Sequence, residues 1–534
     1  MSNFNSAAQI RDEFRDFLLR MAVYFEPYPE LRSAARELGI IAAALSKPFT
    51  LAVFGYMKTG KSSLINAMIG RPLAPIGTDE TTATLNRISY GDATQEGSIV
   101  VHWRDGRPPE PIPFSRVEDW TGKSAETLAR VRETSHLQFF ANASSLKDVE
   151  IVDTPGIGSV ASDHTMVASE VLSGEEGKKA DALLYVFPAV AKALDAKTLD
   201  EFRKTRLPGS DPYNSIGVLH KWDGLEADDL FAEVGEKARE LGQKLSDVLC
   251  EVIPVSAPLG LVARHAPDSF LEGLLELTTK PVNRDMIVKK LTMSDRWDAD
   301  EAGKRARAAY KDIPWVSFVR VVRLLLDHSC ESVFDSRKIC LQASGLEQLQ
   351  TSLEARFFKR TALIKQRLTR VKAKRPIELG LMKLNEQIDQ LSTDLHHFSA
   401  LLGSAEKGGP HHAWLTSKVK NCRSQRDELD AHAEAADRQR LVEEHRMNLI
   451  EGDLSFLEAM RHHPEWIEDR DRECIRGLLA MEGDRQAKKA PSRVVLEVIL
   501  KRYAVRLQSP DMVARKHFNY LCQRLQQVLQ CVSA

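Results

Sequence analysis

Residues 51–69 read LAVFGYMKTGKSSLINAMI and decide the fold of the chain around them. Four apolar residues come first, a loop with two glycines and two lysines follows, and an apolar stretch completes the run. This order predicts a strand, a phosphate-binding loop and a helix, because glycines let backbone N–H groups turn inward and a helix N-terminus attracts anions. The run therefore predicts a site for a nucleoside triphosphate.

The polar side chains of this loop have distinct expected roles. Lys61 is expected to reach the terminal phosphates, and the Ser62 hydroxyl is expected to bind Mg²⁺. The predicted nucleotide-binding residues of the loop are Gly55, Tyr56, Met57, Lys58, Thr59, Gly60, Lys61, Ser62 and Ser63. The expected ligand is thus a triphosphate together with its magnesium ion.

A second apolar stretch, residues 149–152, leads directly into Asp153, Thr154, Pro155 and Gly156. A carboxylate at the end of a strand can hold the water shell of Mg²⁺, so Asp153 is expected to serve the metal. The N–H group of Gly156 is expected to donate to the terminal phosphate. Residues with these roles form a switch element, because they sense the γ-phosphate.

A third strand-like stretch, residues 215–219, ends at a sequence that can recognise a guanine base. The next four residues contain a Lys-x-Asp core, in which Asp223 is expected to accept hydrogen bonds from the base. The stem of Lys221 is expected to pack along the purine ring. The usual first residue of this motif is Asn or Thr, so His220 removes or remakes one hydrogen bond that braces the base pocket.

A fourth strand-like stretch, residues 251–255, leads into Ser256 and Ala257. Backbone N–H groups at this position commonly contact the guanine carbonyl, and an ordinary strand end is the alternative. The four stretches occur in an order that suits a parallel sheet, since ligands bind beyond the carboxyl ends of such strands. Together they predict a guanine-nucleotide site.

The loop of residues 74–84 lies between the first two of these motifs and carries several threonines. One threonine is expected to close over Mg²⁺ when nucleotide is bound, as switch loops of this class do. Thr82 is the favoured residue and Thr81 is the competitor, while a threonine-rich turn without metal contact is the alternative. The predicted metal ligands are therefore Ser62, Thr82 and Asp153.

With these motifs in this order, the chain resembles the bacterial dynamin-like GTPases, and in particular the isoniazid-inducible type. The resemblance is carried by residues 55–63, the Ala-Pro and Thr-Thr pairs of the loop 74–84, residues 151–156 and residues 254–256. A later segment, residues 344–360, resembles the helix that follows the GTP-hydrolysing G domain in that family. The resemblance covers most of the chain and is weak beyond residue 376.

This resemblance implies an enzyme that hydrolyses GTP to GDP and phosphate with Mg²⁺ as its cofactor. In that family the G domain stands on a helical bundle, and G domains loaded with nucleotide associate with a second copy or with a paralogue. Members remodel or guard membranes. The resemblance therefore implies peripheral contact with an anionic membrane, at the inner face of the cell membrane.

Two residues depart from the pattern of other GTPases. Residue 157 is isoleucine where Ras-like enzymes place a water-orienting glutamine, an absence that dynamin relatives share. Lys58 occupies the fourth position of the loop, where eukaryotic dynamins have serine. Its ammonium could lie near the β–γ bridging oxygen, where negative charge grows during phosphoryl transfer. We therefore expect Lys58, Lys61 and Thr82 to be catalytic, with a merely solvated Lys58 as the alternative.

The composition limits the other classes of function. The chain of 534 residues has 74 Lys and Arg against 75 Asp and Glu, so no global basic field favours nucleic acid as a partner. Its seven cysteines include no CxxC pair, which fits a reducing cytoplasm. No apolar run approaches the roughly 20 residues that span a bilayer, and the charged N-terminal stretch does not resemble a signal peptide. We therefore expect a cytoplasmic protein.

The predicted fold class is an α/β P-loop GTPase domain, with a mostly parallel sheet and helices on both faces, plus an α-helical bundle. The expected domains are N-terminal helices at 1–48 that pack on the bundle, a G domain at 49–285 and the helical bundle or stalk at 286–534. One buried helix face of the bundle is expected at Val316, Val319, Val322 and Leu326. Ser344 with Glu347 predicts a capping box that opens a long helix, and Pro376 is expected to end or kink it.

Two turns of the bundle combine aromatic and basic side chains that suit a membrane interface, residues 407–414 and 460–467. The alternative for each is a tryptophan that covers a helix join. The basic segment 356–375 is a third candidate, although its apolar face favours burial in the bundle. Two other functions stay open: a soluble regulatory GTPase of ribosome assembly or stress signalling, and a GTP-binding scaffold with little turnover.

Overall fold

The computed structural model describes residues 7–56, 58–73, 84–120, 125–154, 180–189, 212, 214–224, 230–279, 284–292, 294–298, 301–311, 313–479 and 492–532. The expected site residues Met57, Thr82 and Gly156 lie outside the described residues, as does Thr81. The chain divides into two compact units, one comprising Pro48–Phe358 and the other Met1–Lys47 with Lys359–Ala534.

The unit Pro48–Phe358 is built on a sheet whose described strands number nine, in the order β4-β3-β5-β2-β6-β1-β7-β8-β9. The strands are β1 (Phe49–Gly55), β2 (Asn86–Tyr90), β3 (Ile99–Trp103), β4 (Glu110–Ile112), β5 (Thr134–Ala141), β6 (Val149–Asp153), β7 (Ala182–Pro188), β8 (Ser215–His220) and β9 (Val252–Val255). From β6 to β9, neighbouring strands run parallel. Every residue of β1 and β8 is buried, as in parallel strands covered on both faces. The mostly parallel sheet expected from the sequence is confirmed.

The strand register brings the predicted motifs to one edge of the sheet. Val53, near the end of β1, pairs with Asp153 at the end of β6. Gly55 pairs with Val186 of β7, and β7 in turn pairs with β8 up to His220. The carboxyl ends of these parallel strands therefore place the phosphate loop, the switch carboxylate and the base-reading motif next to one another.

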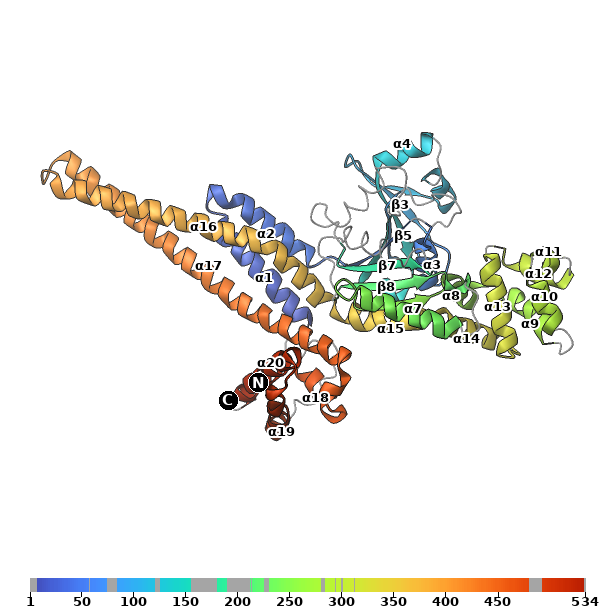
Figure 1. Cartoon of the computed structure of the whole chain (residues 1–534). Coiled ribbons are helices and arrows are strands. Elements are labelled where there is room, and N and C mark those ends of the chain that lie inside the picture. Colours follow the sequence, from blue (N-terminus) through green and yellow to red (C-terminus); the bar gives the residue numbers. More distant parts are fainter. Residues whose placement is uncertain are drawn as a thin grey trace. The chain divides into compact units, whose positions relative to one another are not determined.

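The helices of this unit are α3 (Lys61–Ile69), α4 (Ala125–Glu133), α7 (Leu230–Lys244), α8 (Ala257–His265), α9 (Asp268–Thr278), α10 (Arg284–Lys290), α11 (Ser294–Asp298), α12 (Glu301–Ala309), α13 (Trp315–Asp327), α14 (Val333–Ser344) and α15 (Leu346–Arg356). One hydrophobic core runs from the sheet through α7 and α8 into α9, α13 and α14 (Figure 1). Phe187, Val262 and Phe318 all belong to it. Because the helices after residue 285 share this core, the compact unit continues to Phe358 rather than stopping at the expected boundary.

The corner between α14 and α15 differs from the expected capping box. Ser344 is the last residue of α14, and its hydroxyl donates to the carbonyl of Leu341 over 2.6 Å. Gly345 follows with a φ of +72°, and a Cβ there would lie 2.1 Å from the carbonyl oxygen of Pro254. The capping-box prediction is wrong, because this corner is fitted against the end of β9 and needs glycine.

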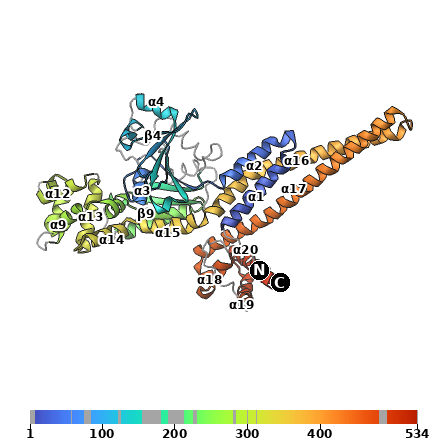
Figure 2. The same cartoon turned by 180° about the vertical axis from the view of Figure 1, so that it is seen from behind.

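The other unit is helical. Its helices are α1 (Ala7–Phe25), α2 (Arg32–Ala44), α16 (Thr361–Ser404), α17 (Pro410–His462), α18 (Asp469–Leu478), α19 (Arg493–Ala504) and α20 (Met512–Val532). The long helices α16 and α17 form an antiparallel pair on which α1 and α2 pack (Figures 1 and 2). The shared core includes Phe14, Leu18 and Phe25 from α1 together with Ile377 and Leu384 from α16.

Short 3-10 helices complete the elements of both units. They are η1 (Pro29–Leu31), η2 (Phe114–Trp120), η3 (Ser144–Leu146), η5 (Trp222–Gly224), η6 (Phe358–Arg360), η7 (Pro464–Trp466) and η8 (Val505–Gln508). None of the helices in the described part of the chain combines the length and apolar character that crossing a bilayer requires.

The helix α16 passes through Pro376 without ending there. Ala373 and Ile377 on either side of the proline are buried against α1 and α2, so tertiary packing compensates for the hydrogen bond that proline removes. The basic segment before Pro376 also takes part in this packing. Lys365 donates through Nζ to the carbonyl oxygens of Ala44 and Lys47.

The two turns considered as membrane tips differ in the structure. Trp414, near the start of α17, is 49% exposed and makes an edge contact with Phe398 at 6.2 Å between ring centroids. Trp466 is buried and packs against Phe518 at 5.7 Å. The turn 460–467 is therefore a covered helix join and not a membrane tip.

Candidate nucleotide-binding site

The phosphate loop joins β1 to α3 in a conformation that its glycines permit. Gly60 has a φ of +93° and directly precedes Lys61, the first residue of α3. A Cβ at Gly55 would lie 2.6 Å from the carbonyl oxygen of Val186. Lys58 also has a positive φ, of 59°, which is uncommon for a residue with a side chain and is typical of strained functional loops.

The ammonium of Lys61 lies over the loop backbone. Nζ donates to the carbonyl oxygens of Gly55 at 3.3 Å and Tyr56 at 3.2 Å, and the side chain is buried. Burial lowers its pKa, and the charge of Asp153 acts in the opposite direction. Thr59 donates through its hydroxyl to the Tyr56 carbonyl over 2.9 Å, which fixes the same turn. The loop therefore holds a cationic group where the terminal phosphates are expected.

Ser62 and Asp153 meet beneath this loop. The Ser62 hydroxyl donates to Oδ2 of Asp153 over 2.6 Å. Asp153 is fully buried, and its Oδ1 has no hydrogen-bond partner within the described part of the chain. Burial raises the pKa of Asp153 to about 6, while the charge of Lys61 and the Ser62 hydroxyl oppose that rise.

The donor set around Asp153 fits magnesium. A buried carboxylate oxygen without a partner beside a serine hydroxyl offers the hard oxygen ligands that Mg²⁺ prefers. The end of β6 is held firmly, since the Thr154 hydroxyl donates to the Val53 carbonyl over 2.8 Å. Ser62 and Asp153 are thus brought together as the sequence predicted, whereas Thr82, the third expected ligand, lies outside the described residues.

His220 braces the base-reading side of the site. Its Nε2 accepts a hydrogen bond from the N–H of Ala257 at 3.2 Å. The ring also packs on the phosphate loop, since a Cβ on Gly60 would lie 2.5 Å from the ring carbon Cε1. Burial lowers the pKa of His220 to about 4, so the imidazole is neutral near pH 7. A hydrogen bond to the His220 imidazole therefore replaces the bracing hydrogen bond that the usual Asn or Thr would make.

Lys221 links the base-reading motif to the phosphate loop. Its φ is +63°, and its Nζ donates to the carbonyl oxygen of Lys58 over 2.6 Å. The two lysines with positive φ are therefore joined directly. The contact of the Lys221 stem with a purine ring stays a prediction.

The carboxylate of Asp223 is held by α13. Asp223 is 5% exposed, and its Oδ2 accepts a hydrogen bond from the hydroxyl of Ser317, which is 3% exposed. Arg320, one turn further along α13, donates through Nε to the Asp223 carbonyl at 3.5 Å. The sequence motifs indicate neither α13 residue, because neither belongs to a motif that follows a strand.

The backbone N–H groups of Ser256 and Ala257 have partners inside the unit. Ser256 donates through N–H to the Ser344 carbonyl at 2.9 Å, and Ala257 donates to His220. The Ser256 hydroxyl accepts from the N–H of Leu259 at 3.4 Å and so caps α8. Both N–H groups are thus bonded within the unit, and their contact with a guanine carbonyl stays a prediction.

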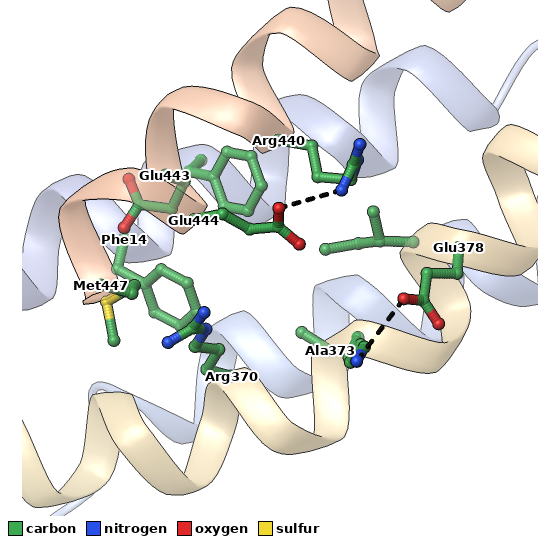
Figure 3. A pocket seen from close by; sticks show the side chains of 11 residues that line it. Phe14, Arg370, Ala373, Glu378, Arg440, Glu443, Glu444 and Met447 are labelled. Carbon is green, nitrogen blue, oxygen red and sulfur yellow. Dashed lines mark ion pairs between the residues drawn. The ribbon is translucent and has the colours of Figure 1, made fainter. Parts of the chain in front are cut away.

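A pocket in the helical unit offers no comparable chemistry. It lies where α1, α16 and α17 meet, and Figure 3 shows its lining side chains. Three basic residues are matched by three acidic ones at this pocket, namely Arg370, Lys374, Arg440, Glu378, Glu443 and Glu444. Two ion pairs join charges one helical turn apart, Arg440 with Glu444 and Lys374 with Glu378. The charges balance, so the pocket gives no electrostatic preference for a ligand.

The sheet, the glycine loop and the lysine over it define an α/β P-loop nucleotide-binding domain joined to a large helical region. Residues 51–222 match the family model described as the dynamin family. Over these residues the chain is therefore similar to proteins of the dynamin family.

Similar proteins come from several bacteria. The isoniazid-induced protein IniC of Mycobacterium tuberculosis is 28% identical over 235 residues, which cover 43% of this chain and 46% of that protein. The bacterial dynamin-like protein of Nostoc punctiforme is 33% identical over 120 residues, which cover 20% of this chain and 17% of that protein. The match to IniC thus spans about half the length of that relative.

A solved structure of an oligomerised bacterial dynamin pair aligns with 82% of this chain and 75% of that chain at 15% identity. The TM-score is 0.29, which is too low to compare the geometry of the two chains.

Proposed function

We propose that the chain is a magnesium-dependent GTPase that hydrolyses GTP to GDP and phosphate. The observation that carries this proposal is the convergence of Lys61, Ser62 and Asp153 at the phosphate loop, with an unpartnered carboxylate oxygen on Asp153. The dynamin-family match of residues 51–222 supports the same reaction class.

Each of these residues would have its own role in phosphoryl transfer. The loop N–H groups and Lys61 bind the phosphates and stabilise the charge that develops on them. Ser62 and Asp153, with the predicted Thr82, would hold Mg²⁺, which when bound neutralises phosphate charge. The predicted Gly156 N–H would donate to the γ-phosphate. Asp223 accepts hydrogen bonds from guanine and so orients the nucleotide for attack by water.

The side chain of Lys58 is the proposed additional catalytic group. It is exposed on the loop, and its backbone is fixed by the bond from Lys221. In this proposal its ammonium takes the place of a monovalent cation or an arginine finger, within one chain or across a G-domain dimer. GTP turnover of Lys58→Ala and wild type, each with and without K⁺, tests this role. Unchanged turnover in all four conditions would remove Lys58 from the mechanism.

Phosphate release at rising protein concentration tests the enzymatic proposal. We expect turnover per molecule to climb with concentration, because pairing of G domains with a second copy or a paralogue would complete the site. A rate that is flat and negligible at every concentration would instead support the alternative of a GTP-binding scaffold.

We further propose that turnover is coupled to peripheral remodelling or protection of an anionic membrane at the cytoplasmic face. This proposal rests on the resemblance to the bacterial dynamin-like proteins, a name that two of the similar proteins carry. The exposed Trp414, with Lys418 5.7 Å from its ring, is the candidate contact.

Co-sedimentation with anionic vesicles in the presence of GTP tests the membrane proposal. We expect wild type to pellet and Trp414→Ala to pellet less. Phe334→Ala is the matched control, because Phe334 is an exposed aromatic residue of the other compact unit. A wild-type protein that stays in the supernatant would favour a soluble regulatory GTPase.

A further inference from the structure

The helix α13 contributes a side chain to the base-reading motif although it lies outside the family match. That match ends at residue 222, whereas Ser317 is 94 positions beyond Asp223. The two side chains are nevertheless in hydrogen-bond contact and almost completely buried. A serine hydroxyl in such a place has a defined partner, because buried polar groups are costly without one.

The side chains of Lys221 and Ser256, two other predicted residues of the base side, are engaged elsewhere. The ammonium of Lys221 is directed to the Lys58 carbonyl at 2.6 Å. The hydroxyl of Ser256 accepts the N–H of Leu259, at the start of α8. In the described residues, the side-chain hydrogen bond to the Asp223 carboxylate comes from Ser317 on α13.

A carboxylate held in this way can still accept from a base. Each carboxylate oxygen has two lone pairs, so Oδ2 can accept the Ser317 hydroxyl and a further N–H donor. The Ser317 bond restricts rotation of the carboxylate, and the Arg320 contact restrains the Asp223 backbone. A guanine would therefore meet acceptors that are already oriented, which lowers the entropy cost of binding.

We propose that Ser317 is a positioning residue for base recognition and that guanine selectivity depends on the docking of α13. The inference rests on the proposed function as a guanine-nucleotide enzyme. It assigns a role in nucleotide choice to a helix whose sequence carries no nucleotide-binding motif.

The test is calorimetric titration of wild type and Ser317→Ala with GTP and with ATP, each with Mg²⁺. Loss of one hydrogen bond to a charged group predicts GTP binding weaker by about tenfold. ATP binding is expected to change little, because adenine does not present the same donors to Asp223. The preference for GTP over ATP then falls by about the same factor.

The matched control is Ser336→Ala. Ser336 is a fully buried serine of α14 in the same compact unit, and its hydroxyl donates to the Ser332 carbonyl over 2.9 Å. A merely structural effect of removing a buried hydroxyl would appear in both variants and would not change the GTP to ATP ratio. In an Asp223→Ala background, Ser317→Ala is expected to have no further effect on GTP affinity.

The outcomes separate this inference from the function on which it rests. If wild type binds neither nucleotide, the proposed function fails. If wild type prefers GTP and Ser317→Ala keeps the same preference, the positioning role is overturned. If Ser317→Ala does not fold, Ser317→Cys is the second variant: its S–H is too weak a donor to replace the hydroxyl, so the GTP preference is expected to fall, though by less than for alanine. A GTP preference equal to that of wild type would overturn the role.

Discussion

The carboxylate on the phosphate side of the candidate site, Asp153, and the carboxylate on the base side, Asp223, differ in their hydrogen bonding. On the phosphate side, Asp153 has a buried oxygen without a partner and a pKa raised to about 6 by burial. On the base side, Asp223 and the N–H of Ala257 are engaged by Ser317 and His220. Asp153 thus offers an oxygen ligand that suits a cation, whereas Asp223 is oriented by a side chain of the protein.

This difference indicates what each side controls. Changes on the phosphate side should remove turnover, because they affect charge at the reacting atoms. Changes on the base side should alter nucleotide choice and stability, because they affect groups that brace one another. Four predictions test this division.

Lys61→Ala has the largest expected effect. It removes the cation over the loop and leaves Asp153 without its opposing charge. We expect GTP turnover to fall by about a thousandfold, which is the upper range for loss of one group that stabilises developing charge. Phosphate release measures the effect, with Lys244→Ala on α7 as the control. Turnover within a few-fold of wild type would contradict the assigned role of Lys61.

Asp223→Asn follows. The amide replaces one acceptor by a donor, so two hydrogen bonds from guanine are lost or opposed, and GTP affinity should fall by about a hundredfold. Xanthosine triphosphate, which has a carbonyl acceptor at the corresponding position, should gain affinity. Competition binding with both nucleotides measures the exchange. Unaltered GTP affinity would place the base away from Asp223.

Gly60→Ala tests the contact between the two sides. A Cβ would approach the His220 ring to 2.5 Å at a backbone φ of +93°. We expect the free energy of unfolding to fall by about 1–3 kcal/mol, measured by urea denaturation. Gly235→Ala on α7 is the control, because its Cβ would have no neighbour within 4 Å. Equal stability of the two variants would argue against the packing of His220 on the loop.

The smallest expected effect is the change in the free energy of unfolding with pH that His220 causes. His220 has a pKa of about 4 when folded against 6.5 ordinarily, so the unfolded chain binds the extra proton between these values. The His220 contribution to stability is therefore full above pH 6.5 and lost as pH falls toward 4. The slope is at most about 1.4 kcal/mol per pH unit.

Comparison with His220→Asn isolates this contribution, because asparagine can still accept the Ala257 N–H. The comparison is needed because Asp153, with its raised pKa, has the opposite slope between about pH 4 and 6. Identical pH profiles of unfolding for the two proteins would show that His220 is not held neutral.

The sequence identified the strands and the phosphate side because each has a local signature. The expected strands 51–54, 149–152 and 215–219 lie within β1, β6 and β8. The proximity of Ser62 and Asp153, which are 91 positions apart, could also be predicted, since both residues belong to motifs at strand ends. Parallel-sheet geometry then places them together.

The base side of the site could be predicted from the sequence only in part. Of the apolar face expected on α13, Val322 and Leu326 are buried as predicted, whereas Val316 is 50% exposed. The prediction is wrong at the first position alone, where the neighbouring Ser317 is buried and contacts Asp223. The Gly345 corner and the helix through Pro376 were missed for the same reason, since tertiary contacts decided them.

Calorimetric titration of the purified wild-type chain with GTP and with ATP, each with Mg²⁺, tests the central claim most directly. The account predicts measurable binding of GTP and a clear preference for it over ATP. No heat with GTP, or tighter binding of ATP, would contradict the account.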